Sequence, residues 1–512
     1  MAEARISEDQ HAALRSLLRP DEILTPDSPD YQCRAQTWAS QKQMNPDLVV
    51  RPTSTESLSK TVAYLYSTDL DIGIYGQGFM SASAKDVLIN TSAFDGFNFD
   101  QHSELVTIGA GQTWSEVYRK LGEAAPEYGI VGARTPCVGV AGTIVSGGFS
   151  WLSGEYGCIS DPANMLDAKV VKYDGSVVWA SAEPELLWAL RGGGGGFGVM
   201  VQVVLRVFPY SQDIWSGQIL VPRERLEQVA EGIATFLSQP LDPKITMFLY
   251  VVKKSLLESI GTDSDMLVIH AFDALGEAHG RKSFQWALNI PGAIDQTKIN
   301  TLAGVAKLQD KAHIVKGSMK QFWAPLLIRE LSAETVVRAI RWSEEIQQLD
   351  ESLADCTYLI FELLSSCEPA GPRSNCGWPR PEGVKHILLL GTGCPGDAGP
   401  LKEKLSRDLA CQAASRVLGE GAEFHYLPNG FEDFHDARKT WGPHFHQLQT
   451  SRRHYDPKNK FKGAVNPYDV GLDIWRGERQ TKTSGMEKVS SFVLSFEPAV
   501  RGLGVTNVIL ID

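Results

Sequence analysis

The sequence lacks several features that would place the protein in a particular class. Its 512 residues contain no run of about 18 consecutive apolar residues, so no transmembrane helix is predicted. It has no basic run and a formal net charge of −12, which argues against nucleic acid or an anionic membrane as a partner. The N-terminus lacks the basic-then-apolar pattern of a secretory signal. We therefore expect a cytoplasmic protein, with a secreted protein whose signal was trimmed as the alternative.

Cysteine and histidine are too sparse to form a recognisable metal site. The eight cysteines form neither a CxxC pair nor a metal-ligand cluster, and we expect them to be reduced thiols. His444 and His446 are two residues apart, but no third ligand follows at a metal-binding spacing. No metal is therefore expected.

Glycine, by contrast, is abundant in a central stretch that has little charge. Residues 131–168 include Gly139, Gly142, Gly147 and Gly148, contain no lysine, and have Arg134 as their only arginine. The missing lysine excludes a P-loop, in which a lysine must reach the phosphates. Residues without a Cβ let backbone N–H groups close on a ligand. On this stretch alone, a glycine-rich turn between two strands is an equally good interpretation.

Two further segments, 47–91 and 185–206, change that balance. Together with residues 131–168, they resemble in order and spacing the PCMH-type FAD-binding domain of the vanillyl-alcohol-oxidase and berberine-bridge-enzyme superfamily. The string RRHYDPKNKF at 452–461 is similar to the YDPxNxF motif that closes this family's sequences. The resemblance covers roughly residues 40–211 and resumes near the C-terminus.

The resemblance implies an α+β fold in which a two-part FAD-binding domain is joined to a substrate domain. The substrate domain is itself α+β, with an antiparallel sheet covered by helices. The implied division is an FAD-binding domain at 1–211 (core 40–211), a substrate domain at 212–440, and a C-terminal segment at 441–512 that returns to the FAD domain. Residue patterns in the middle part predict helices at 222–238, 333–349 and 399–417, and strands at 245–253, 264–272, 356–364 and 385–391. The Pro- and Gly-rich run 368–382 is expected to be a surface loop.

This chain departs from its relatives at both positions where they bond the flavin covalently. Relatives commonly have Gly-Gly-His where this chain has Gln77-Gly78-Phe79, and phenylalanine has no nucleophilic atom. Relatives with a flavin-linked cysteine carry Cys-Pro-x-Val-Gly, whereas Thr135 stands at that cysteine position here. Cys137 points to the same side but is displaced by roughly 6–7 Å. We therefore expect FAD to be bound without a covalent link.

The matching motifs also indicate which residues contact FAD. A strand that runs into a glycine turn presents consecutive N–H groups to a pyrophosphate. Tyr156 and Asp161, within Gly-Glu-Tyr-Gly-x-x-x-Asp, are expected to position the cofactor and its loop. The expected cofactor-binding residues are Tyr75, Gly76, Gln77, Gly78, Phe79, Met80, Ser81, Thr135, Pro136, Cys137, Val138, Gly139, Gly142, Thr143, Ser146, Gly147, Gly148, Tyr156, Gly157, Asp161, Val199 and Tyr455.

Substrate oxidation needs a base for the proton and the flavin N5 atom for the hydride. In relatives, the base is often a tyrosine or histidine on the last strand of the substrate domain or just after it. Tyr426 is the first candidate, because a strand over 423–427 places it on the face opposite His425. His444 is the second candidate. For each, a structural role is the alternative interpretation.

The leading hypothesis is an FAD-dependent oxidoreductase, and more specifically an oxidase, that acts on a small organic substrate of specialised metabolism. The small side chain of Val138 favours O2 as the electron acceptor, because a small residue there leaves room for O2 in relatives. The alternative is a redox-silent relative that uses its pocket for cyclisation, isomerisation or dehydration, with FAD as a structural cofactor. A third hypothesis is a binding protein without flavin. The sequence does not indicate the substrate or the oligomeric state.

Overall fold

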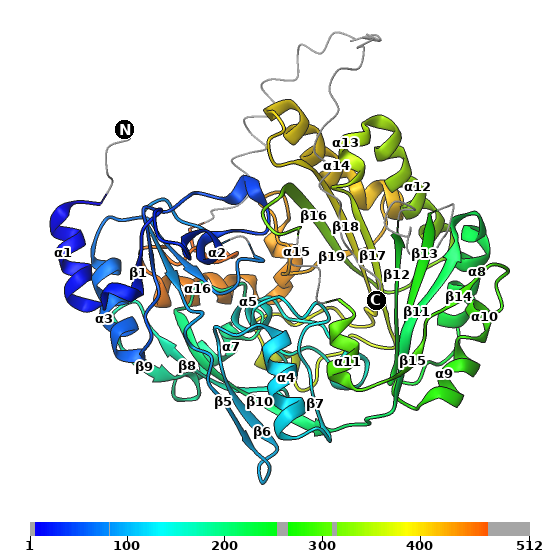
Figure 1. The fold of residues 1–512 in the computed structure, drawn as a ribbon, viewed down its shortest axis with the longest axis horizontal. Coiled ribbons are helices and arrows are strands. Elements are labelled where there is room, and N and C mark those ends of the chain that lie inside the picture. The colour runs from blue at the N-terminus through cyan, green and yellow to red at the C-terminus, as the bar shows by residue number, and fades with distance from the viewer. Residues whose placement is uncertain (1–5, 81, 253–264, 310–314, 469–512) are drawn as a thin grey trace.

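The computed structural model describes residues 6–80, 82–252, 265–309 and 315–468. In this part of the chain, three β-sheets form two halves (Figure 1). Two smaller sheets lie in one half, and a nine-stranded sheet lies in the other. None of the described helices combines the length and apolarity needed to cross a membrane.

The first sheet has four strands and carries a β-α-β unit. Its strand order is β1 (Ile23–Leu24), β2 (Leu48–Val50), β4 (Val87–Asn90) and β3 (Ile72–Tyr75), and the last three are parallel. Helix α3 (Thr55–Ser67) connects β2 to β3 and buries one apolar face, while α1 (Glu8–Leu17) packs against it. Ser7 caps α1 in a capping box with Gln10.

The second sheet has six strands and lies in the same half as the first sheet. Because this half contains the segments expected to bind FAD, it is called the FAD half. The strand order of the second sheet is β5 (Phe97–Asp100), β6 (Leu105–Gly109), β10 (Val199–Pro209), β8 (Met165–Val171) and β9 (Val177–Trp179), with β7 (Tyr128–Ile130) paired to β10. Helix α4 (Trp114–Ala124) begins at a capping box formed by Thr113 and Glu116. The short helices nearby are α2 (Tyr31–Ala35), α5 (Val140–Val145), α6 (Ser153–Tyr156) and α7 (Pro184–Leu190).

The third sheet is the nine-stranded antiparallel sheet that the resemblance implies. Its order is β14 (Ile294–Asp295), β11 (Ile214–Pro222), β13 (Met266–Asp273), β12 (Ile245–Val252), β17 (Tyr358–Leu364), β18 (His386–Pro395), β16 (Met319–Ile328) and β19 (His425–Tyr426), with β15 (Lys298–Asn300) paired to β11. The helices that accompany it are α8 (Leu226–Leu237), α9 (Glu277–Ser283), α10 (Gln285–Leu288), α11 (Leu302–Lys307), α12 (Ala333–Leu349), α13 (Glu351–Ala354) and α14 (Pro400–Leu418).

Alternation along these strands separates two cores. In β12, Met247 and Leu249 join the core shared with α8, α12 and α14, whereas Phe248 and Tyr250 join the core shared with the FAD half. Successive side chains of a strand point to opposite faces, so one face of the sheet is covered by helices and the other faces the FAD half (Figure 1). The α+β fold expected from the sequence is confirmed.

The helices and strands predicted for the middle part of the chain agree with the structure, but a strand without alternating apolar and polar residues was not predicted. The helix predicted at 333–349 coincides with α12, and the helix predicted at 399–417 corresponds to α14. Strand β16, by contrast, was not predicted. It reads MKQFWAPLLI, which has no alternation and includes Pro325.

The run 368–382 is only in part the surface loop that was predicted, because residues 376–378 and Arg380 are buried whereas residues 368, 371, 372, 374, 375 and 382 are exposed. Trp378 is 1% exposed, and an ideal Cβ on Gly147 would lie 2.5 Å from its ring, while one on Gly192 would lie 2.8 Å from its Cβ. The absence of a side chain at Gly147 makes room for the indole ring, and its absence at Gly192 makes room for the start of the Trp378 side chain. Arg380 forms a fully buried ion pair with Asp161.

The C-terminal segment packs against the FAD half. Helices α15 (Ala437–Trp441) and α16 (Phe445–Tyr455) lead into the YDPxNxF motif, and α16 packs against α7. Asp456 accepts hydrogen bonds from the Tyr66 hydroxyl (2.8 Å) and from the backbone N–H of Phe461 (2.9 Å). The described part of the C-terminal segment, up to residue 468, thus contacts the FAD half.

Acid is expected to destabilise the protein through its buried histidines. Burial among Trp151 and Phe248 lowers the pKa of His270 to about 3, and burial lowers the pKa of His386 and of His435 to about 4. As the pH falls below about 6.5, these histidines take up protons in the unfolded chain but stay neutral in the folded chain. Their contribution to the free energy of unfolding is therefore fully present above about pH 6.5 and is lost as the pH falls to the folded-state pKa values.

For His270 alone, the expected loss of unfolding free energy between pH 7 and pH 3 is on the order of 4 kcal/mol. Thermal unfolding of wild type and His270→Phe across this range measures it, with the exposed His102→Phe as control. The midpoint of His270→Phe should fall less than that of the control. Parallel pH curves for the two variants would contradict the prediction.

Candidate active site

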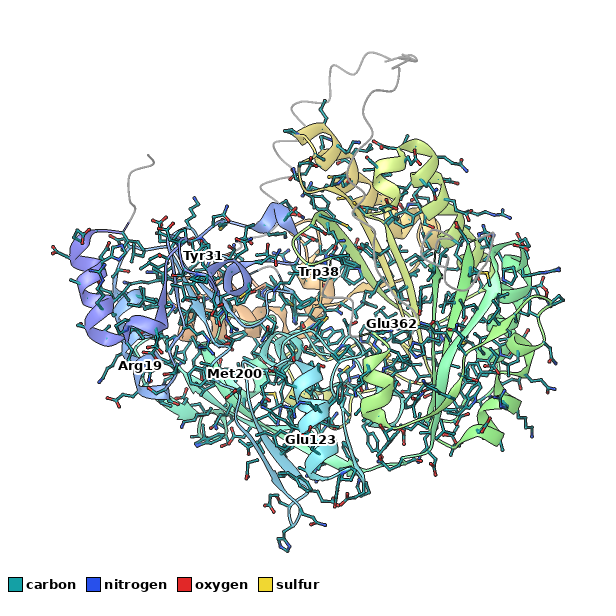
Figure 2. The ribbon with its side chains drawn as sticks, viewed as in Figure 1. Arg19, Tyr31, Trp38, Glu123, Met200 and Glu362 are labelled. Atoms are coloured by element: carbon teal, nitrogen blue, oxygen red, sulfur yellow. The ribbon has the colours of Figure 1, made fainter. Side chains whose placement is uncertain are left out.

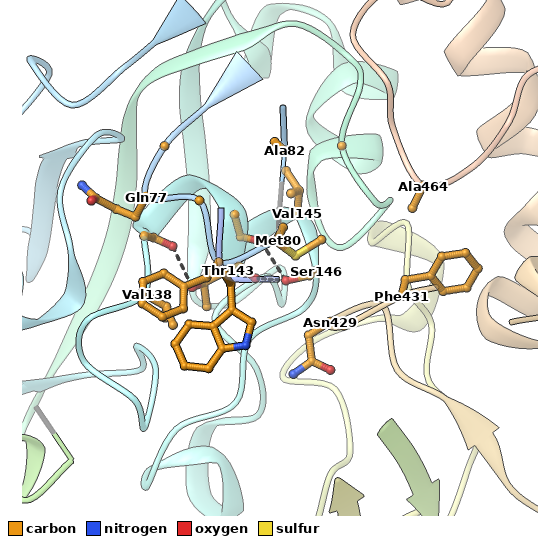
Figure 3. A pocket seen from close by; sticks show the side chains of 18 of the residues that line it. Gln77, Met80, Ala82, Val138, Thr143, Val145, Ser146, Asn429, Phe431 and Ala464 are labelled. Carbon is orange, nitrogen blue, oxygen red and sulfur yellow. Dashed lines mark hydrogen bonds between the residues drawn. The ribbon is translucent and has the colours of Figure 1, made fainter. Parts of the chain in front are cut away.

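A cavity of about 1270 Å³ lies between the two halves. Its walls come from three glycine-rich segments of the FAD half, from the inner face of the nine-stranded sheet, and from residues 429–431 and 461–464 (Figure 3). A typical small-molecule pocket has roughly 300–1,000 Å³, so this space suits a dinucleotide and a substrate together.

The first glycine segment follows β3 and presents unpaired donors. Within the described residues, none of the backbone N–H groups from Gly76 to Met80 donates a hydrogen bond to another protein group. All of these residues line the cavity, and no atom lies within 4 Å of an ideal Cβ placed on Gly76. Consecutive free N–H groups beside open space form a binding place for an anionic group such as a pyrophosphate.

A lysine from the other half supports this loop. The Lys316 ammonium group donates to the Gln77 carbonyl (2.7 Å) and to the Tyr75 hydroxyl (2.9 Å), and burial lowers its pKa to about 8. The Gln77 side chain donates in turn to the Gly111 carbonyl (2.7 Å). The loop is therefore fixed from behind, while its N–H groups face the cavity.

In the second glycine segment, the hydroxyl groups of Thr143 and Ser146 are hydrogen-bonded to the segment's own backbone. Thr143 donates to the Gly139 carbonyl (2.8 Å) and Ser146 to the Gly142 carbonyl (2.7 Å), both within or next to α5. These small side chains are thus satisfied locally. They leave the backbone accessible to a ligand along this wall (Figure 3).

The third glycine segment leaves no room for a side chain at residue 196. The φ of Gly196 is +85°, a backbone conformation that favours glycine. An ideal Cβ there would lie 2.0 Å from a guanidinium nitrogen of Arg452, which hydrogen-bonds to the Gly196 carbonyl. Arg452 is also paired with the fully buried Asp456. A side chain at residue 196 is therefore replaced by an arginine from the C-terminal segment.

The cavity brings together about half of the residues expected to bind FAD. Those that line it are Gly76, Gln77, Gly78, Phe79, Met80, Thr135, Val138, Gly139, Gly142, Thr143, Ser146 and Gly148. Those that are not among its lining residues are Tyr75, Pro136, Cys137, Gly147, Tyr156, Gly157, Asp161, Val199 and Tyr455. Ser81 lies outside the described residues.

The residues outside the lining have structural partners. The Asp161 carboxylate accepts from Arg380 and from the Cys158 and Ala370 N–H groups, which secures the glycine segment from behind. The Tyr156 ring stacks on Phe208 with centroids 3.9 Å apart. These contacts fit the supporting role expected for Asp161 and Tyr156.

The two catalytic candidates do not reach the cavity. Tyr426 lies on the helix-covered face and stacks on His435 at 4.0 Å, because the predicted strand 423–427 is only the two-residue β19. The Nδ1 atom of His444 is 3.0 Å from the Cys376 carbonyl, and its ring packs against Trp188. The structure therefore gives both residues structural contacts in place of the catalytic position expected for them.

A buried ion pair at the cavity was missed by the sequence reasoning. Glu362, in the middle of β17 (Figure 2), is 4% exposed. It pairs with Arg134, which is 7% exposed. Arg134 also lies over the Phe248 ring at 4.8 Å, and burial lowers its pKa to about 9. Both signals were present: Glu362 is the only charged residue of its strand, and Arg134 is the only cation of its glycine-rich stretch.

The remaining cavity wall is rich in aromatic side chains. They come from the N-terminal segment, the first glycine loop, two strands and the segment after β19, and they are Trp38, Phe79, Trp323, Tyr358 and Phe431. Asn429 stands beside Phe431 and reaches into the same space (Figure 3). The sequence patterns did not single out any of these residues except Phe79.

Comparisons with known proteins agree with this geometry. Residues 46–181 match the family model described as FAD binding domain. The chain is 28% identical over 476 residues to an FAD-dependent monooxygenase of Penicillium roqueforti, covering 86% of this chain and 90% of that protein. Two other fungal relatives are matched over only 49% and 42% of their own lengths.

Solved structures share the fold. The 6-hydroxy-D-nicotine oxidase of Arthrobacter nicotinovorans superimposes with a TM-score of 0.72 at 21% identity, over 88% of this chain and 99% of that chain. The berberine bridge enzyme of Eschscholzia californica gives 0.72 at 14% identity, over 89% and 98%.

Residues 46–181 thus match an FAD binding domain, and the chain shares the fold of 6-hydroxy-D-nicotine oxidase and berberine bridge enzyme. Its cofactor is FAD. The free N–H groups of residues 76–80 and the bare glycine backbone at the cavity fit that cofactor.

Proposed function

We propose that this protein is an FAD-dependent oxidoreductase that oxidises a small organic molecule, with non-covalently bound FAD and O2 as the electron acceptor. One observation carries the proposal. A buried carboxylate, Glu362, enters the cavity from the substrate side, opposite the glycine segments that would hold FAD. The FAD domain over 1–211, the substrate domain over 212–440 and the returning segment 441–512 are proposed as its parts.

When bound, FAD would accept a hydride at its N5 atom. The protein orients the substrate and accepts its proton. The substrate loses a hydride and a proton, and Glu362 is placed to accept the proton. Arg134 pairs with Glu362 and holds the carboxylate in place beside the cavity. Both side chains are nearly excluded from water, which strengthens their interaction with a substrate in the cavity.

Non-covalent binding follows from the side chains beside the expected FAD site. Phe79 lines the cavity and stacks on Trp38 at 5.1 Å, so an apolar ring stands where relatives carry the bonding histidine. Thr135 lines the cavity but offers no thiol, and Cys137 is not among the lining residues. Neither covalent link of the family is therefore expected.

A redox-silent relative is the second candidate, and the substitutions at Phe79 and Thr135 favour it. Loss of both links is expected to lower the flavin potential and to weaken the flavin as an oxidant. The protein would then use Glu362 for acid–base chemistry only.

Two measurements on the purified protein test the proposal. After acid precipitation, the yellow colour should be released into the supernatant; colour retained in the pellet would contradict non-covalent binding and point to Cys137. Under anaerobic conditions, a panel of small aromatic and alicyclic alcohols and amines is then screened for bleaching of the flavin absorbance, with recovery on admission of air. Turnover of a substrate without bleaching would support the redox-silent candidate instead.

A further inference from the structure

The substrate side of the cavity has a flat aromatic platform. Trp323 on β16 and Tyr358 on β17 both lie opposite Gly391 of the intervening strand β18. Their rings are stacked with centroids 5.9 Å apart and planes 23° apart. An ideal Cβ on Gly391 would come within 2.9 Å of the Trp323 ring, so this glycine is what allows the indole to lie across the sheet.

A second aromatic pair lies on the wall formed by the N-terminal segment and the first glycine loop. The Trp38 and Phe79 rings are stacked with planes 27° apart, and both line the cavity. The Trp38 indole N–H donates to the Gln321 side chain. The Tyr358 hydroxyl is directed to the Met319 sulfur (3.6 Å). The polar edges of Trp38 and Tyr358 are thus used elsewhere, and their apolar surfaces are left for a ligand.

Most polar groups on this side already have protein partners. Gln41 donates to the Gln321 carbonyl, Thr357 donates to the Leu353 carbonyl (2.8 Å), and Lys42 is paired with Glu432 (2.7 Å). Apart from the charged pair of Glu362 and Arg134, the Asn429 side-chain oxygen is a buried acceptor of this wall without a hydrogen-bond partner within the described residues. A buried acceptor without a donor costs free energy, and a ligand that brings a donor recovers it.

We propose that the substrate is a planar, largely apolar aromatic compound with a phenolic O–H or a ring N–H that donates to the Asn429 side-chain oxygen when the amide turns this oxygen toward the cavity. Stacking on aromatic faces suits a flat ring system, whereas a sugar needs several polar partners that this wall does not supply. The proposal rests on the proposed function only in taking the bound compound to be the substrate. Binding itself needs no redox step.

The test uses the full-length protein loaded with FAD and three probes. Isothermal titration calorimetry measures the affinities of 2-naphthol, 2-methoxynaphthalene and cellobiose, and flavin difference spectra locate binding near the ring. We expect 2-naphthol to bind about tenfold more tightly than its methyl ether, because only the naphthol has a donor. Cellobiose should bind more weakly than either. Cellobiose as the tightest probe, or equal affinities for the two naphthalenes, would overturn the proposal.

Two variants locate the effect. Asn429→Ala should reduce the naphthol preference to within about twofold and leave FAD affinity unchanged, while the matched control Asn98→Ala, on the exposed side of β5, keeps the preference. An Asn429→Ala protein that keeps the preference, or that loses FAD affinity instead, would contradict the assignment.

Trp323→Leu tests the platform independently and still gives an answer if Asn429→Ala does not fold. Both naphthalenes should bind about tenfold more weakly, with their ratio preserved. Unchanged affinities in this variant would overturn the platform. A wild-type protein that shows the naphthol preference while no substrate bleaches its flavin would contradict the proposed function and leave the binding inference standing.

Discussion

Glu362→Gln is expected to slow flavin reduction by a factor of about 10² to 10⁴, which is the usual contribution of a positioned general base. The amide has nearly the shape of the carboxylate but cannot accept the substrate proton. The large effect is expected because, among the described residues that line the cavity, Glu362 combines a carboxylate with almost complete burial on the substrate side. Asp355 also lines the cavity but lies outside the sheet, after α13.

Anaerobic stopped-flow measurement of flavin bleaching, with the substrate found in the screen, gives the rate directly. Glu362→Asp keeps a carboxylate for Arg134 and should recover part of the rate, which separates loss of the base from loss of the ion pair. Glu423→Gln, at an exposed glutamate, is the matched control. FAD content, measured for every variant, shows whether the cavity is intact. A Glu362→Gln rate within about threefold of wild type would rule out the assigned base.

Asp161→Asn is expected to lower the unfolding free energy by about 3–5 kcal/mol, the usual result of breaking a buried ion pair on one side. Asp161 and Arg380 have fully buried side chains, joined by two hydrogen bonds of 2.8 and 2.7 Å. The same carboxylate accepts the Cys158 N–H (2.7 Å) and the Ala370 N–H (2.9 Å). Its replacement leaves a buried guanidinium without a counter-charge.

Denaturant unfolding of wild type and variant gives the difference, and the exposed pair of Arg329 and Glu423 provides the comparison. Glu423→Gln should cost less than about 1 kcal/mol, because exposed ion pairs contribute little. The double variant Asp161→Asn/Arg380→Met should be less destabilised than the sum of its single changes, since no unpaired charge remains. A loss for Asp161→Asn no larger than that of Glu423→Gln would contradict the structural role of the pair.

Several features of this protein were predictable because their causes are local in the sequence. Ser7 and Thr113 cap their helices through residues three positions away, and the helix predicted at 333–349 has the observed bounds. The glycine segments predicted FAD for the same reason. A backbone that approaches a ligand closely needs residues without a Cβ, and these appear as glycines close together in the sequence.

The two catalytic candidates are not among the residues that line the cavity, for a physical reason that the sequence does not display. Tyr426 was placed on an expected strand of five residues, but only two residues pair with β16, and the Tyr426 side chain packs on the helix-covered face against His435. A strand's alternation tells which residues share a face. It does not tell which face meets the cavity.

The sequence by itself determined the cofactor, the fold class, and most of the loops that line the FAD side. Only the tertiary structure decided what faces those loops: the pairing of Glu362 with Arg134, the aromatic platform over Gly391, and the burial of Trp378 under Gly147. Each of these depends on strand register and on the contact of segments far apart in the chain. Such contacts form where side-chain shapes fit, and a single sequence carries no local signal of that fit.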